Sequence, residues 1–273
     1  MTTIGISDHE FSQFQRFIYD AAGITLSSAK KALVGGRLAK RLQHCEVGSY
    51  SEYFQLLSSG SAPAEVQMAV DLLTTNETYF FREAKHFDFL KEQVLSAAKS
   101  ALPFRVWSAA SSTGEEAYSI AMVLADRLDG RAWEVIGSDI SARVLQRARA
   151  GHYSTERTTH IPPGYLKRFC LKGTGTQQGT LLVERALRNR VQFTKVNLNE
   201  TLPPMGEFDI IFLRNVMIYF NADTKRQVIA RLISQLKPGG YFLVGHSETL
   251  NDLTTAVKAV APSIYRKPLT GGA

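Results

Sequence analysis

Two polar side chains, Asn215 and Tyr219, follow a short apolar run and have the chemistry to bind a ligand. The run Phe208–Leu213 is β-branched and aromatic, which is typical of a fully buried strand. Side chains just after a parallel strand lie at the carboxyl edge of the sheet, where open α/β folds bind their ligands. There the Asn215 amide can hydrogen-bond a ligand and the Tyr219 hydroxyl can face a substrate. The alternative is a strand end with an Asn turn and a core tyrosine.

A loop of small residues follows an earlier predicted strand, at residues 104–107, and opens a helix. Ala109, Ala110 and Gly114 in this loop let a ligand approach the backbone closely. Asp139 ends the next predicted strand, about 25 residues beyond Gly114, near where nucleotide-binding folds place a carboxylate for ribose hydroxyls. We therefore predict an adenosine-containing ligand. A tight turn with an ordinary helix cap is the alternative.

Acidic residues at this loop narrow the class of ligand. The loop lacks the G-x-G-x-x-G spacing, and Glu115 and Glu116 disfavour the pyrophosphate of a dinucleotide or of ATP. A ligand with an ammonium and a sulfonium group is favoured by acidic neighbours instead. S-adenosylmethionine meets both requirements.

The elements that must position these residues divide the chain in two. Helical periodicity predicts only helices over the first ~80 residues, one of them capped by Asp8 and ended by Gly23. The other predicted helices cover residues 28–43, 50–57, 64–73 and 84–97. From Phe104 strands alternate with helices, which predicts an α/β fold with a parallel sheet. Its strands are expected at 104–107, 133–138, 191–196, 208–213 and 241–244, with an edge strand at 263–267. Glycines at 173, 175 and 179 predict an inserted antiparallel hairpin at about 166–186.

Composition and charge exclude several classes of protein. The chain has 273 residues, 44% hydrophobic and 21% charged, as in an ordinary globular protein of one or two domains. No run approaches the ~18 apolar residues of a membrane span, and no secretory signal begins the sequence, so we expect a cytoplasmic protein without membrane insertion. Two cysteines argue against a disulfide scaffold or a cysteine metal cluster. The net charge of +7 predicts an acidic partner.

Four segments together resemble the chemotaxis receptor methyltransferases, the CheR family. They are TNETYFFRE at 75–83, VWSAASSTGEEAYSIA at 106–121, RNVMIYF at 214–220 and GHSE at 245–248. They stand in the family's order, and the similarity spans about residues 7–267. The resemblance implies a Rossmann-like class I methyltransferase sheet, a small all-α N-terminal domain and an inserted antiparallel β subdomain. The implied boundaries are 1–83 for the helical domain, 84–102 for a linker helix and 103–273 for the methyltransferase domain.

The activity implied by this resemblance is methyl transfer from S-adenosylmethionine, which leaves S-adenosylhomocysteine. The implied substrates are glutamate side chains in the cytoplasmic helical region of membrane chemoreceptors. The resemblance assigns the cofactor to Asn76, Thr78, Arg82, Ala110, Glu116, Asp139, Asn197, Leu198, Asn215 and Val216. It places Arg82 and Tyr219 nearest the transferred methyl group and gives the ribose hydroxyls to Asp139. No metal is expected, and the protein is expected to be a monomer.

The second predicted helix carries a basic stripe. Its members, with Lys40 beside the main face, are Lys30, Arg37, Lys40, Arg41 and His44. An acidic helical substrate would give Lys30, Arg37, Lys40 and Arg41 a docking role, which the resemblance also implies. A solvated face is the alternative interpretation.

Three other functions compete with receptor methylation as interpretations of the sequence. A nucleic-acid methyltransferase is disfavoured because residues 214–217 lack the D/N-P-P-Y/F motif and no nucleic-acid-binding module is present, so no nucleic-acid partner is expected. A serine hydrolase elbow at 245–249 lacks its final glycine, and all six histidines precede Ser247. A noncatalytic receptor-binding module remains open.

Overall fold

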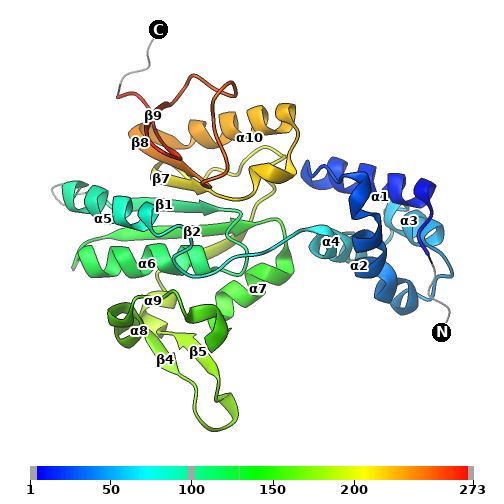
Figure 1. Ribbon diagram of the computed structural model, residues 1–273, viewed down its shortest axis with the longest axis horizontal. Coiled ribbons are helices and arrows are strands. Elements are labelled where there is room, and N and C mark those ends of the chain that lie inside the picture. The colour runs from blue at the N-terminus through cyan, green and yellow to red at the C-terminus, as the bar shows by residue number, and fades with distance from the viewer. Residues whose placement is uncertain (1–4, 98–101, 129, 270–273) are drawn as a thin grey trace.

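The computed structural model describes residues 5–97, 102–128 and 130–269. A seven-stranded mixed sheet covered by helices forms the centre of the molecule. The helical domain lies at one side of it, and the small β subdomain projects below it in the view of Figure 1. Among the described residues, no helix has the length and apolar character that crossing a bilayer requires.

The N-terminal domain consists of helices packed on one core. They are α1 (Asp8–Ala22), α2 (Lys31–His44) after a 3-10 turn (Ser28–Lys30), α3 (Tyr50–Ser58) and α4 (Pro63–Leu73). The expectation that Asp8 caps the first helix is wrong, because Ser7 and Glu10 form a reciprocal capping box there. The apolar faces meet in a core that includes Phe14, Ile18 and Leu38.

The main sheet has the strand order β6-β2-β1-β7-β8-β10-β9. The strands are β1 (Phe104–Ala109), β2 (Trp133–Asp139), β6 (Val191–Lys195), β7 (Phe208–Leu213), β8 (Leu236–Val244), β9 (Lys258–Ala261) and β10 (Ile264–Arg266). The first five in spatial order are parallel, and β10 is antiparallel to both of its neighbours. The direction of winding reverses between β1 and β7, which is the point where such sheets bind ligands.

Helices cover both faces of this sheet. Helices α5 (Lys85–Ala97) and α6 (Glu115–Arg127) pack on one face, whereas α10 (Ala222–Ser234) packs on the other. Helix α7 (Ala142–Ala150) follows β2, and the Ser141 side chain caps its first turn. Successive residues of β1 alternate between the faces, so that Val106 joins the α6 side and Trp107 joins the α10 side.

The edge of the sheet differs from the sequence-based expectation. The strand expected at the edge, β10, lies between β8 and β9, and β9 is the edge strand instead. No sequence pattern predicts β9, because its residues Lys258–Val260 are exposed and lack apolar alternation.

The small subdomain is a three-stranded antiparallel sheet in the order β3-β5-β4. The expected hairpin is present as β4 (Cys170–Lys172) and β5 (Thr180–Val183). A third strand, β3 (His152–Ser154), was missed and extends the sheet from the chain just after α7. Short helices, α8 (Pro163–Phe169) and α9 (Arg185–Arg188), flank these strands.

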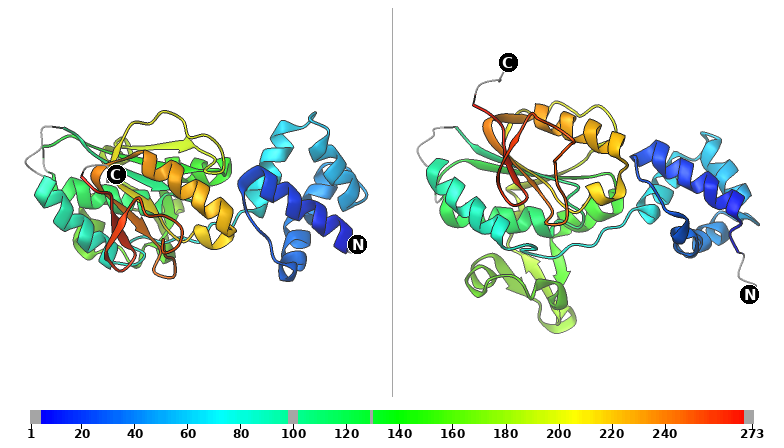
Figure 2. Two further views of the ribbon diagram at one scale, coloured as in Figure 1. Left: turned by 90° about the horizontal axis from the view of Figure 1, so that it is seen from above. Right: turned by 45° about the horizontal axis from the view of Figure 1, so that its top comes forward.

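The helical domain is attached to the sheet domain at the end of α1. Both views of Figure 2 place this end beside the start of α10. Gly23 has a left-handed φ of 71°, and a Cβ there would lie 2.7 Å from Thr224 of α10, so only glycine permits the approach. Just beyond it, the Thr25 N–H donates to the Tyr219 carbonyl over 2.8 Å, and Ile24 forms an antiparallel bridge with Phe220.

Candidate functional site

A cavity with about 950 Å³ of empty space, including its opening to solvent, lies at the carboxyl edge of the parallel strands. The segment between α4 and α5, residues 74–84, also lines it and is called the linker below. Side chains after β1, β2, β6 and β7 line it, together with the linker and the end of α1. Every residue expected to hold the cofactor lines this one cavity, as does Tyr219: Asn76, Thr78, Arg82, Ala110, Glu116, Asp139, Asn197, Leu198, Asn215 and Val216.

Asp139 is fixed at the end of β2 by main-chain donors. Its carboxylate accepts the N–H groups of Ser112 and Ser141, each over 2.9 Å. Burial raises the pKa of Asp139 to about 6, against the pull of these hydrogen bonds. The carboxylate oxygens still have lone pairs for hydroxyl donors of a ligand in the cavity.

The loop after β1 has an unusual backbone. Ala110 and Ser112 have positive φ angles of 59° and 50°, and Gly114 has 94°. Such conformations are costly for residues with a side chain and gather at ligand sites. The Ser112 hydroxyl donates to the Asn76 carbonyl over 2.9 Å, which ties the loop to the linker. The small side chain of Ala110 leaves the ligand side of this loop open, as its sequence predicts.

A buried arginine, Arg214, connects the walls of the cavity. Its guanidinium donates to Glu116 over 2.7 Å, to Glu83 over 2.9 Å and to the Arg82 carbonyl. Although burial opposes ionisation, Arg214 lowers the pKa of Glu83 to about 2. Arg214 belongs to the 214–220 motif, but no sequence pattern predicts this role for it.

The two glutamates of the small-residue loop have different environments. Glu116 lines the cavity, where its carboxylate accepts from Ser108 and Arg214, each over 2.7 Å. Glu115 is fully buried and faces away, paired with Arg157 over 2.8 Å. Of the two acids predicted to favour a cationic ligand, Glu116 therefore lines the cavity and Glu115 does not.

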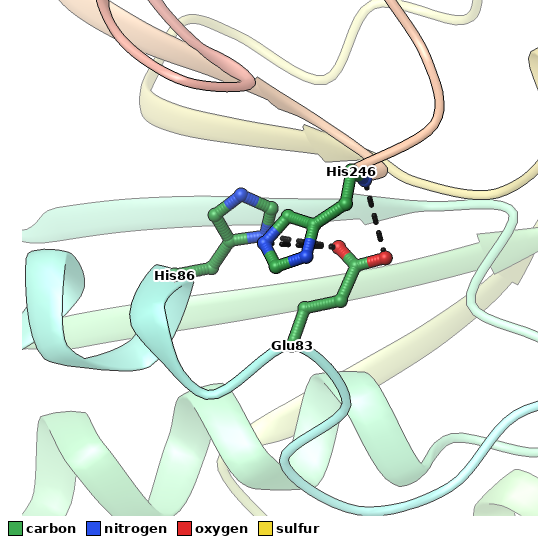
Figure 3. A group of neighbouring side chains, drawn as sticks. All are labelled: Glu83, His86 and His246. Carbon is green, nitrogen blue, oxygen red and sulfur yellow. Dashed lines mark hydrogen bonds and ion pairs between the residues drawn. The ribbon is translucent and has the colours of Figure 1, made fainter.

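Glu83, which pairs with Arg214, forms a compact group with His86 and His246 (Figure 3). His86 Nδ1 lies 3.4 Å from the Glu83 carboxylate, and the main-chain N–H of His246 donates to the same carboxylate over 3.2 Å. Burial, with a smaller effect of the Arg214 charge, lowers the pKa of His86 to about 3, so its imidazole is neutral near pH 7. Because Arg214 already compensates Glu83, the group joins the linker to the loop after β8 without needing a further cation.

The loop after β8 in turn fixes Asn215. One oxygen of Glu248 accepts the N–H groups of Asn215 and Gly245, each over 2.7 Å. This holds Asn215 in a left-handed conformation with a φ of 58°. A Cβ at Gly245 would lie 2.4 Å from the Asn215 amide nitrogen, so a larger residue would displace it. The G-H-S-E motif is thus a support for the cavity wall.

Arg82 and Tyr219, the residues expected near the reacting methyl, both face this cavity. The Arg82 guanidinium donates to the Glu77 carbonyl over 3.1 Å and lies 5.7 Å from the Tyr79 ring centroid. It makes no ion pair with any described carboxylate. The carboxylates nearest to it in sequence on its C-terminal side, Glu83 and Asp88, pair with Arg214 and Lys91. Arg82 therefore retains its charge for an anionic group.

The basic stripe of α2 does not form one continuous surface. Arg41 makes a two-pronged ion pair with Glu65, which also accepts from Tyr53. Arg37 is half-buried and donates to the carbonyls of Leu73 and Thr74. Lys30, Lys40 and His44 are exposed. Charge reversal at Arg41 would break a structural pair, so it would not test docking.

We expect Asp139→Asn to weaken S-adenosylmethionine binding by about 10- to 100-fold, because the amide loses a charged acceptor. Calorimetric titration measures the Kd. Since the pKa of Asp139 is about 6, wild-type affinity should fall as the pH drops through 6, whereas the variant should show no such step. Equal affinity of the two proteins at pH 8 would remove Asp139 from the ligand site.

Known proteins match this chain along both domains. A family model described as "CheR methyltransferase, SAM binding domain" matches residues 76–265, and one described as "CheR methyltransferase, all-alpha domain" matches residues 9–74. A chemotaxis protein methyltransferase of Escherichia coli is 41% identical over 268 residues, which cover 96% of this chain and 92% of that protein. Chemotaxis protein methyltransferase 2 of Pseudomonas aeruginosa is 40% identical, with 94% and 92% covered.

Proposed function

This chain belongs to the CheR methyltransferase family, and from that premise we propose that it methylates glutamate side chains of chemotaxis receptors. Its fold is a class I methyltransferase domain with an all-α domain before it, and its cosubstrate is S-adenosylmethionine. One observation carries the proposal beyond the family. The uncompensated guanidinium of Arg82 faces the same cavity as the Asp139 carboxylate.

The cavity has the chemistry to hold S-adenosylmethionine. It is lined by polar and apolar side chains at the carboxyl edge of the sheet, where open α/β folds bind their ligands. Asp139 offers acceptors for ribose hydroxyls, and Ala110 leaves room beside the backbone. Glu116 provides negative charge for an ammonium group, although Arg214 shares that charge. Val196 and Leu198 supply apolar wall.

The residues of this chain then have to orient the substrate carboxylate, guide the methyl group and exclude water. When bound, S-adenosylmethionine supplies an electrophilic methyl sulfonium. A glutamate carboxylate is ionised near neutral pH, so the protein need not provide a general base. Arg82 orients the carboxylate through its planar fork, and the Tyr219 hydroxyl donates to it or shapes the path of the methyl. Apolar side chains such as Phe87 and Phe220 keep water from the reacting oxygen.

The same proposal specifies which part of the receptor is methylated and in which compartment. The substrate is the cytoplasmic helical region of a membrane receptor, so the enzyme works in the cytoplasm. The net charge of +7 favours encounter with such an acidic surface. The expected monomeric state and the absence of a nucleic-acid partner stay predictions.

Incubation with S-adenosylmethionine labelled in its methyl group and with a candidate receptor tests this function. We expect label on the receptor that alkali releases as methanol, the behaviour of a carboxyl methyl ester. A receptor with its modified glutamates replaced by alanine is the control and should stay unlabelled. Cofactor binding without label on any receptor would instead favour a noncatalytic module, and label on nucleic acid would favour the rival methyltransferase.

A further inference from the structure

A second groove, open to solvent, lies between the helical domain, α7 and the segment after β3. In Figure 1, α7 lies between the β subdomain and the helical domain, so the groove opens at the junction of three parts of the fold. Its walls include Arg37 of α2, Arg143 and Arg147 of α7, and Arg157 and His160 beyond β3.

The charges of this groove are unbalanced. Four arginines line it, against the two acids Glu77 and Glu156. Arg157 is paired with the buried Glu115. Arg37, Arg143 and Arg147 form no ion pair with any carboxylate in the described parts of the chain. The Arg37 side chain donates to the carbonyls of Leu73 and Thr74 and to the Thr75 hydroxyl, and the Arg143 side chain donates to the Asp71 carbonyl. All these acceptors are neutral, so they leave the two positive charges uncompensated.

The groove adjoins the reaction cavity, with the linker as their common wall. The same linker residues, Thr74 and Asn76–Tyr79, line both. Tyr79 lies at the boundary, with its ring 4.7 Å from the ring of His160 on one side and 5.7 Å from the Arg82 guanidinium on the other. An elongated substrate that presents one side chain to Arg82 would therefore place its neighbours over the arginine-lined groove.

We propose that this groove binds acidic side chains that flank the target glutamate on the same receptor helix, so that it selects which glutamates are methylated. This rests on the proposed function. Residues one or two turns apart on a helix face are about 5–11 Å apart along its axis, the scale that separates adjoining subsites. Carboxylates at such spacing complement the unpaired arginines, whereas a neutral helix would leave those charges unmatched.

This placement differs from docking on the α2 stripe. Of that stripe, only Arg37 lines the groove. Arg143 and Arg147 come from the opposite wall, on a helix to which sequence reasoning gave no docking role. Because these side chains are exposed and belong to no catalytic contact, their removal should change receptor binding and leave cofactor binding intact.

Charge reversal on α7 tests the groove with a matched control on the same helix. We expect Arg147→Glu to raise the receptor KM about tenfold and Arg143→Glu to do the same, with kcat and the S-adenosylmethionine Kd unchanged. Arg149→Glu makes the same change of charge two residues after Arg147 on α7, but Arg149 does not line the groove. It should leave the KM near the wild-type value. Thermal unfolding of all three variants checks that they are folded.

A double-mutant cycle then tests the acidic partner directly. Receptors with single flanking glutamates or aspartates changed to the amide should lose affinity for the wild type but much less for Arg147→Glu, so that the two changes are not additive. Additive effects, or an unaltered KM in both arginine variants, would overturn the proposal while receptor methylation by the wild type still supports the function. If the variants lose binding of inorganic phosphate but keep the receptor KM, the groove is a small-anion site and the proposal fails. Absence of methylation by the wild type would instead refute the proposed function.

Discussion

Replacing Arg82 with alanine should lower kcat for receptor methylation by about 10²- to 10³-fold while the fold survives. Arg82 faces the reaction cavity without an acidic partner, and its own contacts are the Glu77 carbonyl and the Tyr79 ring. Alanine removes the only group of the linker that can orient a carboxylate through two parallel hydrogen bonds. Single-turnover kinetics at saturating S-adenosylmethionine isolates this step from binding of the cosubstrate.

A matched pair of variants separates charge from geometry at this position. Arg82→Lys keeps the positive charge but loses the planar fork, so we expect it to recover only part of the rate. Arg226→Ala, which removes an exposed arginine of α10, controls for loss of surface charge. Turnover near the wild-type rate in Arg82→Ala would show that Arg82 does not orient the substrate.

The largest effect on stability is expected from Arg214→Met, which should lower the free energy of unfolding by about 3–5 kcal/mol. Methionine fills similar space but leaves Glu83 and Glu116 without their shared cation in a buried setting. For a domain of this size the melting temperature should fall by roughly 10 °C. Adding Glu116→Gln to the variant should restore part of the loss, because one buried charge is then removed.

The pH dependence of this loss has a definite sign. Arg214 lowers the pKa of Glu83 from an ordinary 4.5 to about 2. The stabilisation from that pair is therefore complete above pH 4.5 and disappears as the pH falls toward 2. The difference in stability between wild type and Arg214→Met should shrink over the same window. A constant difference from pH 7 to pH 3 would contradict the role of the Glu83 pair.

Sequence patterns were sufficient to predict the cavity because its residues follow strands. Buried apolar runs marked the ends of β2 and β7, and parallel strands bring Asp139 and Asn215 to one edge whatever the details of packing. Small residues in the loop after β1 signalled close approach of a ligand in the same way. The resemblance added the linker residues Asn76, Thr78 and Arg82, which no strand pattern would have placed there.

The features that were missed depend on contacts between distant segments. Arg214 meets Glu83 and Glu116 across separations of 131 and 98 residues, and no local pattern encodes such a meeting. Glu115 and Glu116 are adjacent in sequence, yet the start of α6 turns them in different directions. The α2 stripe looked continuous because helical periodicity cannot show that Glu65 of another helix neutralises Arg41.

The attachment of α1 has a mechanical consequence for turnover. The main-chain hydrogen bond from Thr25 to Tyr219, with the Ile24–Phe220 bridge beside it, joins the backbone that carries the phenol to the helical domain. A shift of that domain relative to the sheet would therefore displace Tyr219 as well. A substitution at Gly23 that breaks this attachment should disturb the cavity wall at Tyr219 although Gly23 itself lies outside the cavity lining.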